Sequence, residues 1–156
     1  MTGLPLDVPM VRAAHQLAAE HHRGQTDKAG HPYIHHVAAV AAALVDHGPE
    51  AVAAGLLHDI VEDTPVTLHD LVGRGFPPVV VAAVDSVTRR EGEKYMDMVR
   101  RAAADPLGRL VKLADNAHNS DPARLAVLDA RVAGSLRDRY GRARRILLDA
   151  ADADRG

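Results

Sequence analysis

The stretch GLLHDIVEDT, residues 55–64, gathers four ionisable side chains. His58 and Asp59 stand side by side at the end of an apolar run, and Glu62 and Asp63 follow one turn later. In a continuous helix, residues four apart share a face, so His58 would lie above Glu62 and Asp59 above Asp63. Carboxylates are unfavourable at a helix C-terminus, which is already negative, and a divalent cation held by imidazole and carboxylate would compensate them. The alternative interpretation is an exposed acidic helix end beside a buried histidine.

Two further segments place polar groups at the edge of apolar stretches. HPYIHHVAAVA puts His35 and His36 at the start of a helix, where only one of them can face the core, and RLVKLADNAHNS puts Asp115 directly after an apolar run. Taken singly, His36 fits a hydrogen-bonding residue at a helix N-terminus, and Asp115 fits an ion-pair partner of Lys112 or Arg124. Together with the first stretch, they supply two imidazoles and two carboxylates to one candidate metal site.

The composition limits the chemistry that is available. The chain has no cysteine, which excludes a disulfide framework, a thiolate metal site and a cysteine nucleophile, so any metal must be bound by histidines and carboxylates. With 19 basic and 21 acidic residues, no basic face for a nucleic acid polymer or a membrane is expected. The N-terminal segment does not resemble a signal peptide, and no apolar run approaches the ~20 residues that span a bilayer. We therefore expect a cytoplasmic protein with no membrane partner.

The elements that would position these residues are helices. The apolar fraction of 47% consists mainly of Ala, Val and Leu, with one Phe, three Tyr and no Trp, which favours close-packed helices over a sheet. Helical periodicity and Pro or Gly punctuation predict an all-α, compact single domain over residues 1–156. The predicted helices are 11–22, 34–46, 49–63, a short one from Thr67 to Gly75 with a capping box, 78–87, one that begins at Pro106, and 131–151, with TRREGEKY as a polar connection.

The order His, then His-Asp, then a distal Asp resembles the HD phosphohydrolase superfamily. More narrowly, PYIHH, LLHDIVEDT and VKLADNAHN resemble the hydrolase domain of RelA/SpoT homologues and the small stand-alone alarmone hydrolases, over roughly residues 10–128. The resemblance implies a helical bundle of the HD-domain type that usually binds Mn²⁺. It also implies removal of the 3'-pyrophosphate from guanosine tetra- or pentaphosphate, whereas the ligand set alone would accept other divalent transition metals.

The resemblance also assigns roles to individual residues. It implies the metal ligands His36, His58, Asp59 and Asp115, the catalytic acidic pair Glu62 and Asp63, and the substrate-pocket residues Lys28, Tyr33, Lys112 and Asn119. Asp27 and Asp121 stand where the family commonly has arginine, and a carboxylate cannot replace the forked contacts of a guanidinium with a phosphate or a base. Phosphate contacts could come instead from Arg23, Arg89, Arg90 or Arg124.

Two other functions fit the same residues. The first is another HD-family nucleotidase or phosphodiesterase, which would keep the metal site and open a different pocket. The second is a non-catalytic nucleotide-binding domain, against which the Glu62–Asp63 pair argues because binding alone does not require it. Each predicts a small-molecule nucleotide as partner rather than a nucleic acid polymer.

Overall fold

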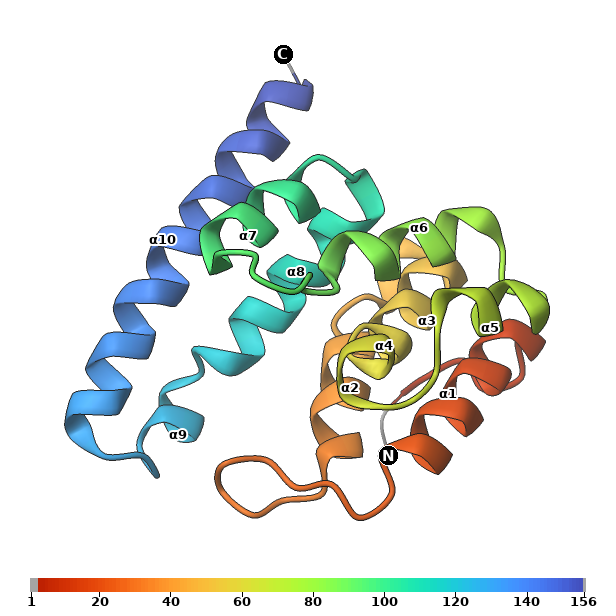
Figure 1. Ribbon diagram of the computed structural model, residues 1–156, viewed down its shortest axis with the longest axis horizontal. Helices are drawn as coiled ribbons and strands as arrows, with labels where there is room; N and C mark the ends of the chain where they lie inside the picture. The colour runs from red at the N-terminus through yellow and green to blue at the C-terminus, as the bar shows by residue number, and fades with distance from the viewer. Residues whose placement is uncertain (1–2, 156) are drawn as a thin grey trace.

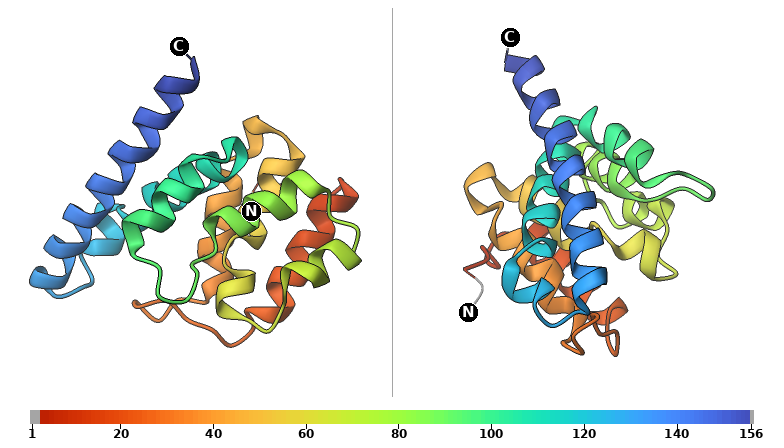
Figure 2. Two further views of the ribbon diagram at one scale, coloured as in Figure 1. Left: turned by 45° about the horizontal axis from the view of Figure 1, so that its top comes forward. Right: turned by 90° about the vertical axis from the view of Figure 1, so that its left-hand side faces the viewer.

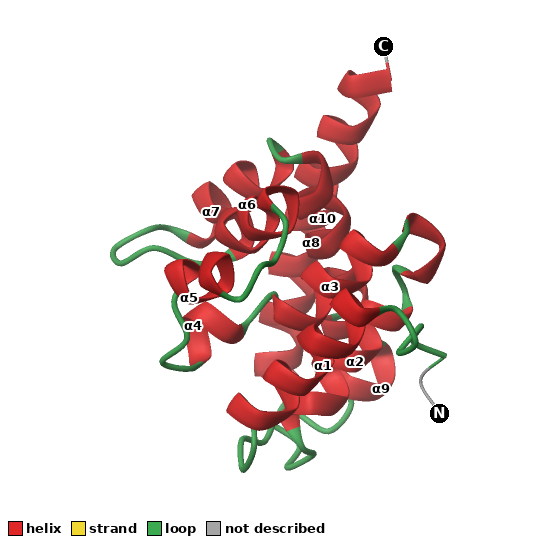
Figure 3. Ribbon diagram, turned by 90° about the vertical axis from the view of Figure 1, so that its right-hand side faces the viewer, coloured by secondary structure: helices red, strands yellow, loops and turns green. Residues whose placement is uncertain are grey.

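The computed structural model describes residues 3–155, which fold into a bundle of helices joined by short loops (Figures 1 and 3). No β-strand occurs in this range, and one isolated bridge joins Thr26 to Pro32, so the all-α prediction is confirmed. Residues 1, 2 and 156 of the predicted domain lie outside the described residues. No helix within 3–155 is long and apolar enough to cross a membrane.

The elements follow one another along the chain in this order: α1 (Pro9–His21), α2 (Tyr33–Ala42), the 3₁₀ turn η1 (Val45–His47), α3 (Pro49–Leu57), α4 (Ile60–Asp63), α5 (Leu68–Gly73), α6 (Pro78–Val87), α7 (Tyr95–Ala103), α8 (Pro106–Asn119), α9 (Pro122–Leu125) and α10 (Ala130–Arg155).

Helix α3 is the centre of the bundle. Every residue from Ala51 to Leu57 is buried, and the helix packs against α1, α2, α6 and α8. Gly55 permits the close approach of α2, because a Cβ atom at this position would lie only 3.1 Å from the Cα of Ala41. This packing brings the start of α2 and the end of α3 together, which places two histidines of the candidate site side by side.

Helix α10 lies along one side of the bundle, where it packs on α7 and α8 (Figure 2). A small apolar cluster fastens it, in which Ala143 and Leu147 of α10 meet Val99 and Ala103 of α7. The C-terminal end of α10 extends beyond the other helices (Figure 2). Helix α10 therefore adds an outer wall to a core that other helices build.

The predicted single helix over 49–63 is wrong, because it breaks between Leu57 and Ile60. The Nδ1 of His58 lies 2.6 Å from the carbonyl oxygen of Gly55 and donates to it, and this oxygen is the acceptor that the Asp59 N–H would use in an uninterrupted helix. Asp59 accordingly leaves helical geometry, with φ −105° and ψ 0°. The break separates the two candidate ligands from the acidic pair, so the four side chains do not share one helix face.

Three other differences concern helix boundaries. The predicted helix over 34–46 ends at Ala42 and is followed by η1, whereas α7 and α9 were not expected at all. Helix α7 begins after Lys94 with neither a side-chain cap nor a proline in its first turn, the two signals that mark α5, α6 and α8. The capping box of Thr67 with Asp70 and the N-cap of Asp105 are both confirmed.

Candidate metal centre and nucleotide cavity

Four side chains from three parts of the chain converge in the interior. His36 comes from α2, His58 and Asp59 from the break after α3, and Asp115 from α8. The Oδ1 of Asp115 lies 3.0 Å from His36 Nε2 and 3.5 Å from His58 Nε2, whereas the Oδ2 of Asp59 lies 2.9 Å from His58 Nε2 and 3.8 Å from His36 Nε2. One ligand atom each from His36, His58 and Asp115 lie within 4.8 Å of one another. Three residues of the predicted ligand set, His36, His58 and Asp115, could therefore hold one ion, and Asp59 lies beside both histidines.

The outer nitrogens of the two histidines have partners of their own. His58 Nδ1 donates to the Gly55 carbonyl, and this bond directs Nε2 of the same ring toward the centre. His36 Nδ1 lies 2.8 Å from Nδ1 of His118. Burial first and then the proximity of His36 lower the pKa of His118 to about 4, so His118 is neutral and can accept a hydrogen bond. Both inner nitrogens can therefore serve as ligands to a cation that displaces any proton on them.

The donor set fits a divalent cation. His58 Nε2 is buried and has no hydrogen-bond partner of suitable geometry among residues 3–155, although two carboxylate oxygens lie within 3.5 Å. An imidazole nitrogen that faces two carboxylate oxygens in the interior is typical of a ligand shell. Burial opposes charge on both His58 and Asp115. The charge of Asp59 first, and then contacts with Asp115, outweigh burial at His58 and raise its pKa. The Lys112 ammonium first, and then the two histidines, outweigh burial at Asp115 and lower its pKa.

Hydrogen bonds around the centre hold the carboxylates in place. The hydroxyl group of Tyr33 donates to Asp59 Oδ2 at 2.5 Å, and the amide of Asn119 donates to Asp115 Oδ1 at 2.9 Å. Lys112 is buried and its Nζ lies 3.0 Å from Asp115 Oδ2, so it sits behind the carboxylate and does not line the cavity described below. The structure thus places Lys112 as a partner of a predicted metal ligand.

The predicted acidic pair lies at the rim of the centre, on α4. Glu62 accepts a hydrogen bond from the backbone N–H of Arg89 at 2.7 Å, whereas the Asp63 carbonyl accepts one from the Gln25 amide at 3.0 Å. Both side chains reach solvent. Loss of hydration on its inner side, followed by the charges of Asp59 and Glu62, raises the pKa of Asp63 to about 6. Asp63 can therefore exchange a proton near neutral pH.

A cavity of about 420 Å³ adjoins the centre. Three of the four residues predicted for substrate binding line it, namely Lys28, Tyr33 and Asn119, and the latter two also bond to the candidate ligands. The sequence did not identify its apolar wall, which consists of Leu125, Val127, Leu128, Leu136 and Tyr140. A cavity with charged groups on one side and this apolar wall on the other suits a nucleotide.

The two departures from the family pattern have local partners. Asp27 accepts hydrogen bonds from the backbone N–H groups of Ala29 and His31 and pairs with Arg124 at 3.2 Å. Asp121 is exposed and caps α9 by accepting from the Ala123 N–H at 2.8 Å. Neither carboxylate is left without a partner.

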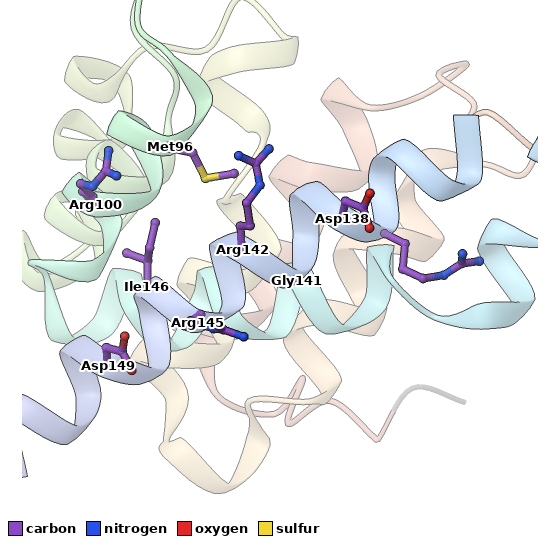
Figure 4. A pocket seen from close by; sticks show the side chains of 9 residues that line it. Met96, Arg100, Asp138, Gly141, Arg142, Arg145, Ile146 and Asp149 are labelled. Carbon is purple, nitrogen blue, oxygen red and sulfur yellow. The ribbon is translucent and has the colours of Figure 1, made fainter. Parts of the chain in front are cut away.

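A second, larger hollow of about 810 Å³ lies between α7 and α10 (Figure 4). It is lined by Met96, Arg100, Arg137, Asp138, Gly141, Arg142, Arg145, Ile146 and Asp149. None of the predicted site residues lines it, and its arginines are exposed to solvent. The smaller cavity is therefore the one that adjoins the candidate metal centre.

Comparisons with known proteins identify the family of this chain. A family model described as HD domain matches residues 14–120. A GTP pyrophosphokinase of Streptomyces coelicolor is 42% identical over 120 residues, which are 70% of this chain and 14% of that protein. The bifunctional (p)ppGpp synthase/hydrolase SpoT of Escherichia coli is 37% identical over 131 residues, 76% of this chain and 19% of that protein. The chain thus spans less than a fifth of the length of these relatives.

The match to one solved structure covers most of both chains. The structure is that of a metazoan ortholog of SpoT that hydrolyzes ppGpp, and it matches with a TM-score of 0.71 and 27% identity over 90% of this chain and 84% of that chain. The matched HD domain model includes the segments that carry the four converging side chains. The chain belongs to the HD domain family.

Proposed function

We propose that this chain is a metal-dependent hydrolase that removes the 3'-pyrophosphate of guanosine tetra- or pentaphosphate, or of a related purine nucleotide. The observation that carries the proposal is the meeting of His36, His58 and Asp115 ligand atoms within 4.8 Å, with Asp59 alongside, next to a cavity of about 420 Å³. The likeness to SpoT and to its metazoan ortholog supports this substrate class. We further propose one domain and Mn²⁺ as the resident ion.

The chain's own residues would divide the work. His36, His58, Asp59 and Asp115 would hold the ion, which supplies a Lewis acid for a phosphoryl oxygen and makes a water easier to deprotonate. Asp63, with its pKa of about 6, would exchange a proton with the reacting groups near neutral pH. The hydrogen bond from Arg89 N–H would orient the Glu62 carboxylate beside it.

The residues around the ligands would keep the centre rigid. Tyr33 and Asn119 each fix one ligand carboxylate while they line the cavity, so they would align the bound nucleotide with the ion. Water attacks the 3'-pyrophosphate, the ester P–O bond breaks, and guanosine tetraphosphate gives GDP and pyrophosphate.

An assay of purified protein with Mn²⁺ tests the proposal. We expect guanosine tetraphosphate to be converted to GDP and pyrophosphate at a rate far above the hydrolysis of GDP or of a generic phosphodiester. The Asp115→Asn variant serves as a control, because it should lose both bound metal and turnover. Hydrolysis of guanosine tetraphosphate no faster than that of GDP would contradict the proposed substrate.

A second candidate is another HD-family nucleotidase or phosphodiesterase. Asp27 and Asp121 favour it, because both carboxylates are bound locally and neither offers a guanidinium to the cavity. Preferential turnover of a different nucleotide in the same panel would select this candidate and leave the metal site unchanged.

A further inference from the structure

The Asp27–Arg124 ion pair is the longest-range charged contact beside the cavity. It joins residues 97 positions apart, from the loop before α2 to the short helix α9, and both side chains line the cavity. The Asp27 side chain is only 8% exposed, whereas that of Arg124 is 29% exposed. The carboxylate is thus enclosed while the guanidinium keeps access to the cavity.

We propose that Arg124 binds the 5'-diphosphate of the nucleotide and that Asp27 is the positioning residue that holds the guanidinium for this contact. The inference deepens the proposed function and rests on it. It explains how a chain with carboxylates in place of two family arginines still presents a guanidinium to its substrate: the guanidinium comes from a different position, Arg124 of α9.

The hydrogen bonds of Asp27 leave Arg124 able to bind a ligand. Oδ1 of Asp27 accepts hydrogen bonds from two N–H groups of its own loop, so these bonds hold the carboxylate in place independently of Arg124. Arg124 uses a single nitrogen, NH1, to reach the other oxygen. A guanidinium has five donors in a planar fork, and no further side-chain partner of Arg124 occurs within residues 3–155. The remaining donors can receive phosphate oxygens.

The position of Arg124 separates its ligand from the reacting group. Tyr33 and Asn119 bond to the candidate metal ligands and mark the reacting side of the cavity. Arg124 makes no hydrogen bond or ion pair with any of the four candidate ligands in the described chain. It neighbours Leu125, Val127 and Leu128 of the apolar wall. A nucleoside against that wall, with its 3' group at the ion, would leave its 5'-diphosphate for Arg124.

GDP is a suitable probe, because it keeps the 5'-diphosphate and lacks the 3' group that reacts. We would titrate GDP and guanosine into the metal-loaded protein by isothermal titration calorimetry. Arg124→Ala should weaken GDP binding by about 10-fold or more, as expected for a lost charge-assisted contact, and leave guanosine binding unchanged. Arg144→Ala removes an exposed arginine of α10 that lines neither cavity, so it should change neither affinity.

Asp27→Asn is the decisive matched variant. It keeps an oxygen for the two loop N–H groups but weakens the ion pair, so GDP affinity should fall by only about threefold. If the pair merely fastened the loop to α9, Asp27→Asn and Arg124→Ala would have equal effects, and that result would overturn the inference. Arg124→Lys keeps the charge without the fork and should lie between them, which preserves the test if Arg124→Ala folds poorly.

The outcomes distinguish this inference from the proposed function. One outcome is that the protein hydrolyses guanosine tetraphosphate while its GDP binding is undetectable or does not change in Arg124→Ala. That result would overturn the diphosphate site and leave the proposed hydrolase standing. Absence of turnover with Arg124-dependent GDP binding would refute the hydrolase and support the diphosphate site.

Discussion

Replacement of Lys112 by methionine would test whether the charges of the centre are arranged for a metal. Methionine matches the length of lysine and can keep contact with the Tyr95 ring, which lies 5.6 Å from the ammonium, but it removes the positive charge 3.0 Å from Asp115. Removal of one partner from a buried ion pair destabilises a protein by about 3–5 kcal/mol. Asp115 keeps its contacts with Asn119 and His36, so we expect the lower end, about 3 kcal/mol, for the metal-free protein.

The assay is calorimetric unfolding with a chelator and again with saturating Mn²⁺. A loss of about 3 kcal/mol corresponds to a fall in Tm of roughly 6–12 °C for a chain of this length. A bound divalent cation replaces the lost charge, so Mn²⁺ should restore at least half of the fall. Lys94→Met, at an exposed lysine, is the control and should shift stability by less than about 0.5 kcal/mol. Equal falls with and without metal would refute the link between Lys112 and the ion.

Three further predictions follow from individual contacts. Asp63→Asn should leave metal content unchanged but lower turnover by ~10²-fold. The fold disfavours the ionised form of Asp63, which is why its pKa is raised, so the stability that protonation supplies is complete below about pH 3.8 and is lost as pH rises through 6. In thermal melts without metal, the Asn variant should therefore be more stable than the unaltered protein by about 1 kcal/mol at pH 7.5, after allowance for solvent screening. Near pH 4 the two proteins should be indistinguishable in stability. Gly108→Ala should destabilise by about 1–3 kcal/mol in urea unfolding, because its Cβ would lie 1.9 Å from Ser86 Oγ, and Ser86→Ala should recover part of the loss. His118→Ala should weaken metal binding by ~10–100-fold, measured by competition with a chelator, through loss of the partner of His36 Nδ1; an unchanged affinity would remove His118 from this role.

The sequence predicted the parts of the fold that have local signals. Capping at Thr67 and Asp105 and proline at the starts of helices are visible in the sequence because each depends on residues within one turn. Helix α7 lacks a side-chain cap, and its polar preceding segment obscured it, although Met98, Val99, Ala102 and Ala103 recur at helical spacing. The break after α3 was invisible because Ile60 continues the apolar pattern and the cause is a side chain bonding to the backbone.

For the candidate site too, the sequence predicted the features that depend on local pattern and missed those that depend on packing. The types of the four candidate ligands were apparent because a histidine or carboxylate at the edge of an apolar run is unusual. The partners of Asp27 and Lys112 depend on which helices meet. Arg124 was only one of several arginines that could serve, and its contact with Asp27 arises from packing across 97 residues. Periodicity carries no information about such pairs.

The apolar wall of the cavity and the candidate metal ligands come from different segments of the chain. The side chains that converge on the ion come from α2, the α3–α4 break and α8, whereas the apolar wall comes from residues 125–140. The segment that carries this wall contacts α8 through a hydrogen bond from Asn116 to the Tyr140 carbonyl, packs on α7 and α8, and contacts the loop before α2 through the Arg124–Asp27 ion pair. Residues 121–140 thus shape the cavity without supplying any of the four candidate ligands. Transplanting them between relatives should exchange the accepted nucleotide while the bond that is cleaved stays the same.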